Sequence, residues 1–393
     1  MNLKFMMLAA VAALLATPSA PRADTVYIES NRADANSLLA FDLNIAGILT
    51  AKNSISTSGT GVEDPSLALG PFDSDQEIIF SSKRSLLFAV NSGSNTIAVF
   101  HVARNGTLSP VKGSPFYSHG INPVSLGLKG EILTVVNKHQ DPMQSTDLTL
   151  PNYTTFKVET DGSLKWTASS VEVAIGSSPS QALVTPFAPL VIGADFLGGL
   201  LRSFVIDRYG ALAESAAIGL PDSEFGDSKA PHLPLGLAVH PRMKLLYVGF
   251  PTANKIGVYK YNWFGKLSFV RTTPDSGAVV CWLATNADGS RLYASNTADP
   301  SVTVYDISVD PENPKEIQRL NISSMGGAYQ IALSPNGQKL IVLTQRFQST
   351  TPQGQGNEVH VLNVDTKGML EEKIAPFVLD LPANTRPQGV VVL

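Results

Sequence analysis

The sequence is poor in charge and almost free of cysteine. Asp, Glu, Lys and Arg make up 16% of the 393 residues, whereas an average domain carries about 25%, and the formal net charge is −4. A mildly acidic chain of this kind excludes a partner that is held by many phosphate contacts, so we expect no nucleic-acid partner. The single cysteine, Cys281, excludes an intrachain disulfide framework and a Cys-rich zinc site.

The sequence also lacks an apolar run of the roughly 20 residues that a membrane-spanning helix needs. Its first 23 residues instead combine one early lysine, Lys4, with a shorter apolar run from Phe5 to Ala16 and then small residues. This order is typical of a secretory signal peptide, with an N-terminal membrane anchor as the alternative. We therefore expect a secreted or periplasmic protein with no membrane attachment after cleavage, whose mature chain is residues 24–393.

A 14-residue pattern recurs along the mature chain. Four copies begin with Asn and carry Gly at the twelfth place and Leu at the last, namely 36–49, 95–108, 254–267 and 357–370. Two weaker copies at 151–164 and 199–212 keep this register, and a seventh around 301–307 replaces the glycine turn with a Pro-containing insert. Alternating apolar residues before the glycine are typical of a strand. Glycine then accepts the positive φ of a hairpin turn, and the leucine begins the returning strand.

The spacing of these copies predicts the fold. The sixth place of each copy holds a large residue, in order Phe41, Phe100, Phe156, Phe204, Tyr259, Tyr305 and Leu362, and the mean spacing is (362 − 41)/6, about 53 residues. Two further strand-like segments precede each copy, so each unit contains four antiparallel strands. Dividing the 370 mature residues by seven also gives about 53. Together these patterns predict an all-β, seven-bladed β-propeller.

The chain ends predict how the ring closes. Residues 24–52 contain only three strands of the first unit, and the C-terminal segment RPQGVVVL, residues 386–393, resembles the segments that begin other units. We expect the N- and C-terminal strands to pair within one blade. No low-complexity stretch or linker divides the mature chain, so we expect residues 24–393 to form a single domain, and a monomer.

Several motifs connect this repeat with a known family. The segments SPNGQKL (334–340), NADGSRLYASN (286–296) and NTIAVFHVARNGTLSPV (95–111) resemble those of the lactonase-type seven-bladed propellers, which include 6-phosphogluconolactonase and carboxymuconate-lactonizing enzymes. The resemblance implies a metal-free enzyme that opens or closes a small carboxylated lactone with His, Arg and Glu from the central cleft. Family members often begin a blade with Pro-His, whereas the corresponding prolines here, Pro123, Pro179, Pro234 and Pro387, are not followed by histidine.

Candidate site residues come from the ends of the central strands. A propeller usually binds its ligand at one mouth of the central channel. The predicted ligand-binding residues are Asn91, Asn137, Asp195, Asn296 and Gln345, and the predicted catalytic residues are His139, Arg346 and Lys138. In this hypothesis Arg346 and Lys138 hold a carboxylate and His139 acts as acid and base. The alternative is that these strand-end side chains satisfy the backbone groups of their own turns.

Two functions follow from these observations. The first is an exported propeller that binds a small carboxylated molecule or a protein at its mouth without catalysis. The second is an active lactonase or lactonizing cyclase. Acidic residues are scattered without metal-ligand spacing, and no nucleotide-binding or zinc-protease motif occurs, so we expect no metal and no cofactor.

Overall fold

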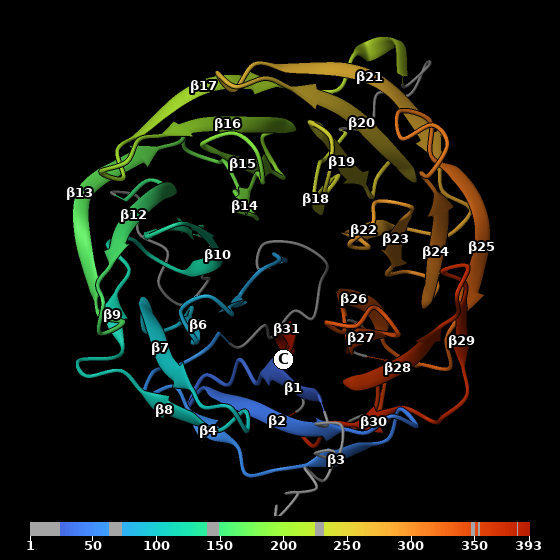
Figure 1. Cartoon of the computed structure of the whole chain (residues 1–393), viewed down its shortest axis with the longest axis horizontal. Coiled ribbons are helices and arrows are strands. Elements are labelled where there is room, and N and C mark those ends of the chain that lie inside the picture. The colour runs from blue at the N-terminus through green and yellow to red at the C-terminus, as the bar shows by residue number, and fades with distance from the viewer. Residues whose placement is uncertain are drawn as a thin grey trace, which may run out of the picture.

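The computed structural model describes residues 24–62, 73–139, 149–224, 232–346, 350–352, 354–382 and 384–393. The regular structure of these parts is β-strand, joined by turns and loops, with one 3-10 helix at Asp222–Glu224. The strands form seven antiparallel sheets around a common centre, as Figure 1 shows. The predicted seven-bladed propeller is therefore confirmed. The expected signal peptide, residues 1–23, lies outside the described residues.

We number the sheets as blades one to seven and give their strands from the innermost outward. Blade one contains β31 (Gln388–Val392), β1 (Asp24–Glu29), β2 (Ser37–Leu43) and β3 (Leu49–Ala51), with β4 (Ile55–Ser56) also on β2. Blade two contains β5 (Ile78–Ser81), β6 (Leu86–Asn91), β7 (Thr96–Val102) and β8 (Leu108–Pro110), with β9 (Phe116–Tyr117) also on β7. Blade three contains β10 (Pro123–Lys129), β11 (Ile132–Asn137), β12 (Asn152–Val158) and β13 (Leu164–Glu172).

The remaining blades repeat this order without interruption. Blade four contains β14 (Leu183–Val184), β15 (Leu190–Asp195), β16 (Leu200–Ile206) and β17 (Leu212–Ile218). Blade five contains β18 (Leu237–Val239), β19 (Leu245–Phe250), β20 (Lys255–Tyr261) and β21 (Leu267–Pro274). Blade six contains β22 (Val280–Thr285), β23 (Arg291–Asn296), β24 (Ser301–Asp306) and β25 (Lys315–Asn321). Blade seven contains β26 (Gly327–Leu333), β27 (Lys339–Gln345), β28 (Glu358–Val364) and β29 (Leu370–Glu372), with β30 (Phe377–Val378) also on β28.

The 14-residue pattern corresponds to the third and fourth strands of each blade. All seven sixth-place residues lie in third strands and are at most 3% exposed. In the six copies with the glycine turn, that glycine has a φ between 78° and 91°, and the final leucine begins the fourth strand. A side chain at this glycine would meet the steric penalty of the left-handed region, which explains why the turn uses glycine.

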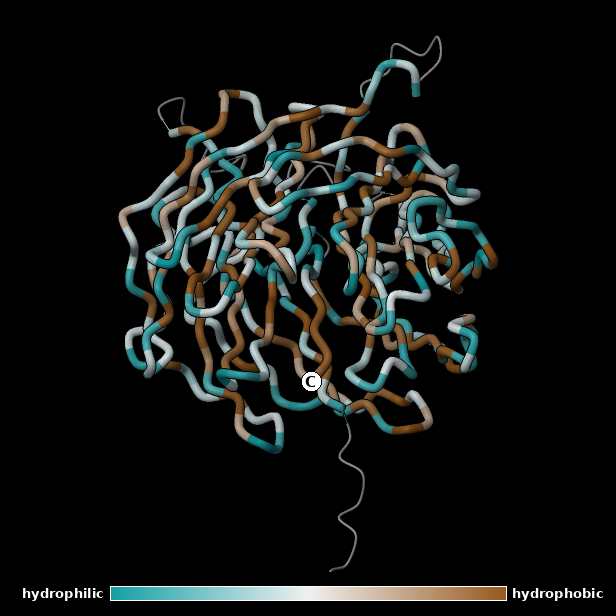
Figure 2. The backbone as a smooth tube through the Cα atoms, turned by 45° about the horizontal axis from the view of Figure 1, so that its top comes forward, coloured by the Kyte–Doolittle hydropathy of each residue, from teal (hydrophilic) through white to brown (hydrophobic). Residues whose placement is uncertain are grey.

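Neighbouring blades bury their sheets against one another. The second strands β6, β11, β15 and β19 are buried at every residue, whereas the fourth strands β13, β17 and β25 carry many exposed residues. Each junction between neighbouring blades contains a hydrophobic cluster drawn from both. Figure 2 shows hydrophobic residues along the strands and hydrophilic residues at many of the turns. The low charge of the sequence follows, because a strand covered on both faces has few positions for a charged side chain.

The two ends of the chain meet in blade one. Val392 lies opposite Val26 in the ladder between β31 and β1, and Thr25 and Leu393 exchange two backbone hydrogen bonds of 3.0 and 2.9 Å. The C-terminal strand therefore supplies the innermost strand of the first blade. The predicted ring closure is confirmed.

Candidate functional site

The predicted site residues gather at one end of the channel. In five blades the innermost strand pairs with the second strand so that the end of the second strand lies beside the start of the innermost one. The paired residues are Pro123–Asn137, Pro179–Asp195, Val280–Asn296, Gly327–Gln345 and Gln388–Glu29. We call this end of the ring the mouth. Asn91 ends β6 in the equivalent place of blade two.

A segment that belongs to no blade strand lies across the channel at this end. Residues 73–77, Asp-Ser-Asp-Gln-Glu, precede the innermost strand of blade two and run into the centre of the ring (Figure 1). Gln330 of blade seven donates to Ser74 O at 2.8 Å, and Gln181 before β14 donates to the side chain of Gln76 at 2.9 Å. We call residues 73–77 the channel segment. It links blades on opposite sides of the mouth through these side-chain hydrogen bonds and through backbone hydrogen bonds of residues 75–77 with Ser180, Leu126 and Val90.

Lys138 is buried completely beside the channel segment. It follows β11 directly, and its ammonium group donates to Asp73 O at 2.6 Å. Among the described residues, this carbonyl is the one acceptor that Lys138 Nζ binds, although an ammonium group has three N–H donors. Burial lowers the pKa of Lys138 to about 7, against the opposing influence of the nearby Asp73 and Glu77 carboxylates. A lysine in such surroundings is a candidate for function.

Arg386 lies on the other side of the same segment. It stands two residues before the closing strand β31, and its Nη2 forms an ion pair of 2.6 Å with Asp73 Oδ1. The two side chains are 1% and 6% exposed, and the guanidinium lies 5.5 Å from the centre of the Tyr329 ring. Asp73 therefore binds Arg386 through its carboxylate and Lys138 through its backbone carbonyl.

Three further acidic residues surround this pair. Glu29 and Glu77 are buried, and burial raises the pKa of both well above the usual range of a glutamate; for Glu77 the charges of Asp75 and Glu29 add to this. Burial likewise raises the pKa of Asp75 to about 7. Gln330 and Ser74 both donate to Glu77 Oε1, at 3.1 and 2.9 Å. Burial therefore favours the neutral forms of these three acids and of Lys138, beside the Arg386 guanidinium.

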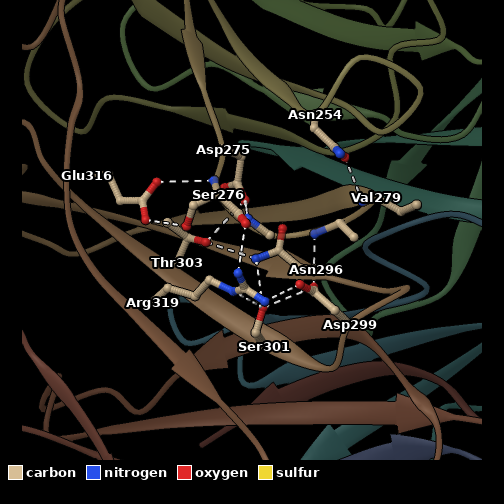
Figure 3. A network of polar contacts seen from close by, with 12 residues as sticks. Asn254, Asp275, Ser276, Val279, Asn296, Asp299, Ser301, Thr303, Glu316 and Arg319 are labelled. Atoms are coloured by element: carbon tan, nitrogen blue, oxygen red, sulfur yellow. Dashed lines mark hydrogen bonds and ion pairs between the residues drawn. The ribbon is translucent and has the colours of Figure 1, made fainter.

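The strand-end asparagines bind their own turns. Asn137 Nδ2 donates to Asn152 Oδ1 at 2.9 Å and Asn91 Nδ2 to Thr96 Oγ1 at 3.0 Å. Asn296 Nδ2 donates to Ser301 and Thr303 within the network of Figure 3, which Asp275 and Arg319 extend. A glycine packs against each of these amides so closely that a Cβ atom would lie 2.2 to 2.4 Å from it, namely Gly59, Gly120 and Gly277. These contacts favour the alternative in which the strand-end side chains satisfy groups of their own turns. Ligand binding by these three residues stays a prediction.

Asp195 and Gln345 also bind within the protein. Asp195 accepts the backbone N–H groups of Ser178 and Gly198 through Oδ1, at 2.8 and 3.0 Å, and pairs through Oδ2 with Arg202 at 3.0 Å. Gln345 donates to Pro387 O at 2.6 Å and to Gln330 Oε1 at 3.3 Å. Gln345 thereby reaches the channel segment through one intermediate side chain, while Asp195 belongs to the framework of blade four. A role of either in ligand binding stays a prediction.

The three predicted catalytic residues have different surroundings. Lys138 lies in the buried cluster already described. Arg346 donates from Nε to Thr351 O at 2.8 Å, so it holds the loop that follows β27. His139 follows Lys138 with a φ of 53° and is half-buried, and its backbone N–H donates to Ile121 O at 3.0 Å. Lys138 contacts the channel segment through Asp73 O. The catalytic assignment of His139 and Arg346 stays a prediction.

Asp73, Glu77 and Arg386 are not among the site residues predicted from the sequence. One signal was available for the acids, because residues 73, 75 and 77 are acidic and stand directly before the strand that opens blade two. Acidic residues so close to an expected innermost strand point towards the channel. Arg386 gave no comparable signal, since an arginine beside a terminal strand is ordinarily a solvated residue.

The described parts of the chain contain neither a metal-binding group of side chains nor a membrane-spanning helix. No group of three or more His, Cys, Asp or Glu residues there could hold a metal ion. No helix within the same residues is long and apolar enough to cross a membrane.

Comparison with known proteins agrees with the architecture. The family model described as "Lactonase, 7-bladed beta-propeller" matches residues 245–388, and a search of curated proteins found no match. Among solved structures, a periplasmic gluconolactonase from Pseudomonas aeruginosa is 15% identical, with a TM-score of 0.68 over 93% of this chain and 99% of that one. A proposed 6-phosphogluconolactonase from Bacteroides uniformis is 16% identical, with a TM-score of 0.68 over 95% of this chain and 100% of that one.

A protein from Lactobacillus plantarum is equally similar, at 15% identity and a TM-score of 0.70 over 95% of this chain and 100% of that one. At these identities the likeness of the structures establishes the fold alone. The family model adds a sequence match that covers blades five to seven and reaches the closing strand. The chain therefore resembles the lactonase-type seven-bladed β-propeller family, in fold over almost its whole length and in sequence over residues 245–388.

Proposed function

We propose that this protein is an exported lactonase-like propeller that binds a small carboxylated molecule at its mouth. The observation that carries the proposal is the ammonium group of Lys138, which is buried completely and binds one acceptor, Asp73 O, among the described residues. A buried donor without an acceptor costs about 1–3 kcal/mol. A ligand oxygen that binds the other N–H donors removes this cost, and a carboxylate also favours the charged form of the lysine.

Proton uptake on binding distinguishes a carboxylate bound at Lys138 from other kinds of ligand. Burial lowers the pKa of Lys138 to about 7, so a substantial fraction of the side chain is neutral at pH 8. A bound carboxylate raises that pKa again, and the lysine then takes up a proton. A neutral sugar, or a protein partner that binds elsewhere on the rim, has no such effect on Lys138.

Calorimetry and thermal unfolding test the proposal. Gluconate and muconate should raise the melting temperature of the folded protein, because a ligand that binds only the native state stabilises it. Titration at pH 8 in buffers of different ionisation enthalpy should show proton uptake. Lys138→Met should lose the binding. Lys129→Met is the matched control, since Lys129 also donates to backbone carbonyls, Thr185 O and Pro186 O, but at the opposite end of β10. Stabilisation of Lys138→Met equal to that of the unchanged protein contradicts the proposal.

A second candidate function is lactone hydrolysis, and the same lysine favours it. A neutral amine at pH 7 can accept a proton from water as that water adds to the lactone carbonyl. The ring C–O bond then breaks, and the proton passes to the departing alkoxide, which leaves a hydroxy acid. In the reverse sense the same groups would close a hydroxy acid to its lactone, with loss of one water.

An assay with a panel of sugar lactones and muconates separates the two functions. Acid release from a lactone, or conversion of a muconate to its lactone, above the buffer rate, lost in Lys138→Met and retained in Lys129→Met, supports an enzyme. Folded protein that binds the carboxylates but releases no acid supports the non-catalytic function.

A further inference from the structure

One acidic residue of this chain fills the anion site at the mouth. Asp73 Oδ1 lies 2.6 Å from Arg386 Nη2, and its backbone carbonyl accepts a hydrogen bond of 2.6 Å from Lys138. The Tyr329 ring lies against the guanidinium, with its centre 5.5 Å away. A buried guanidinium with an aromatic face and a neighbouring ammonium is a suitable environment for a carboxylate. In this structure the carboxylate comes from the protein itself.

The attachment of Asp73 differs from that of a framework residue. Asp195 makes a similar pair with Arg202 but also accepts two backbone N–H groups of its own turn, Ser178 and Gly198. Asp73 stands outside every blade strand, at the start of the channel segment. Gln181 and Gln330 bind this segment through their side chains, and Asp75, Gln76 and Glu77 each make one backbone hydrogen bond, with Ser180, Leu126 and Val90. These backbone hydrogen bonds begin at Asp75, so the Asp73 side chain can leave Arg386 without breaking them.

We propose that the Asp73 carboxylate is an internal stand-in for the carboxylate of the ligand, and that the two compete for Arg386, beside Lys138. The inference rests on the proposed function and adds its regulation. While Asp73 fills the site, only a small fraction of the protein molecules can bind the ligand. The apparent dissociation constant is then the intrinsic constant divided by that fraction. Removal of the Asp73 carboxylate should therefore tighten the binding of small carboxylates.

Calorimetric titration with formate and gluconate tests the competition. Asp73→Ala removes a carboxylate of the size of formate, and we expect it to bind both anions at least about tenfold more tightly than the unchanged protein. Asp195→Ala is the matched control, since it removes the carboxylate of the other buried arginine pair, and we expect no tighter binding there. Equal tightening in both variants, or none in Asp73→Ala, overturns the inference.

The stability of the variant needs its own measurement, because Asp73→Ala leaves a buried arginine without this partner. We expect formate to raise the melting temperature of Asp73→Ala by a few degrees over sodium chloride at equal ionic strength. Asp73→Asn, which keeps the volume of the side chain, should show a smaller rise. If formate restores neither variant, Asp73 serves only to hold the channel segment, and the inference is wrong.

These outcomes also separate the inference from the proposed function. Carboxylates that bind the unchanged protein through Lys138 but bind Asp73→Ala no more tightly leave the proposed function intact and overturn the inference. Carboxylates that bind neither protein overturn both. Carboxylates that bind Asp73→Ala while the unchanged protein needs much higher concentrations support both.

Discussion

Two buried arginine–aspartate pairs in this protein differ in how far apart their two residues lie in the sequence. Arg202 and Asp195 are 7 residues apart within blade four, and the carboxylate also accepts two backbone N–H groups of its turn. Arg386 and Asp73 are 313 residues apart, and their ion pair joins the chain just before the closing strand to the channel segment. The first pair is complete once one blade has formed. The second requires the whole ring.

This difference shows that the Arg386–Asp73 pair depends on assembly of the whole ring, whereas the Arg202–Asp195 pair does not. A buried charge needs a partner, because its transfer from water is costly. In blade four that partner comes from the neighbouring strand of the same sheet, so the pair belongs to the repeat unit. At the mouth it comes from the opposite end of the chain, and the charges meet only when blade one closes. Changes at the two sites should therefore have unequal effects.

Removal of the closing strand should have the largest effect. A chain that begins at residue 24 and lacks residues 386–393 loses both Arg386 and β31, the innermost strand of blade one. We expect loss of cooperative unfolding, by circular dichroism and calorimetry, rather than a frayed end, because the junctions of blade one with its neighbours lose their inner strand. A truncated chain with the melting temperature of the complete one would show that closure contributes little.

Arg386→Met should have the next largest effect. It leaves the Asp73 carboxylate buried beside Tyr329 without its guanidinium, which costs about 3–5 kcal/mol of the free energy of unfolding. Urea denaturation measures this loss. The double variant Arg386→Met, Asp73→Leu is the control and should recover much of the loss, since apolar residues often replace a buried pair without penalty. A single variant within about 0.5 kcal/mol of the unchanged protein would contradict the burial of this pair.

Arg202→Met should cost less, about 1–3 kcal/mol by the same measurement. Asp195 keeps the backbone N–H groups of Ser178 and Gly198, so its charge stays hydrogen-bonded after the arginine is removed. The comparison fails if this variant loses more stability than Arg386→Met.

A third buried ionic cluster gives the smallest expected effect and a pH dependence. His360 Nδ1 lies 2.5 Å from Glu372 Oε1, and Nε2 lies 3.5 Å from Glu358 Oε2. Burial alone would lower the pKa of His360, but hydrogen bonds and charges from the two glutamates outweigh it and raise that pKa; the contacts with His360 lower the pKa of both glutamates.

The sign of the effect follows from these directions. The stability contributed by His360 is complete below its unfolded pKa, near 6.5, and is lost as pH rises through the raised folded pKa. The stability contributed by the glutamates is lost as pH falls through their lowered pKa values. We expect His360→Gln to remove the loss of stability at high pH, which is on the order of 1 kcal/mol. Melting temperatures measured from pH 5 to 9 test this. His101→Gln, at an exposed position of β7, is the control and should leave the profile unchanged.

Much of the ring could be predicted from the sequence because its information is local and repeated. Phe100 or Tyr259 stands a constant distance before a glycine and a leucine, and that distance is set by the geometry of one hairpin. Seven copies of one hairpin pattern give a period, and the period gives the blade number. The closing strand was predictable for the same reason, since residues 386–393 resemble the segments that begin other blades.

The site was less predictable because its contacts are not periodic. The strand-end residues Asn91, Asn137 and Asn296 were placed correctly at one end of the ring, yet their amides bind their own turns, and a strand-end asparagine looks the same in either role. Lys138 was singled out from its position after β11. Its partners Asp73 and Arg386 were not, because their positions in the sequence do not show that they meet.

The sequence by itself therefore determined the hairpin, the blade number, the strand that closes the ring and the end at which its polar residues gather, since each depends on residues close together or repeated at a regular interval. Only the tertiary structure decided which charges meet in the channel. Asp73, Lys138 and Arg386 come from three separate parts of the chain. Closure of the ring brings them together and excludes water. Burial, rather than residue type, then moves the pKa of Lys138 to about 7.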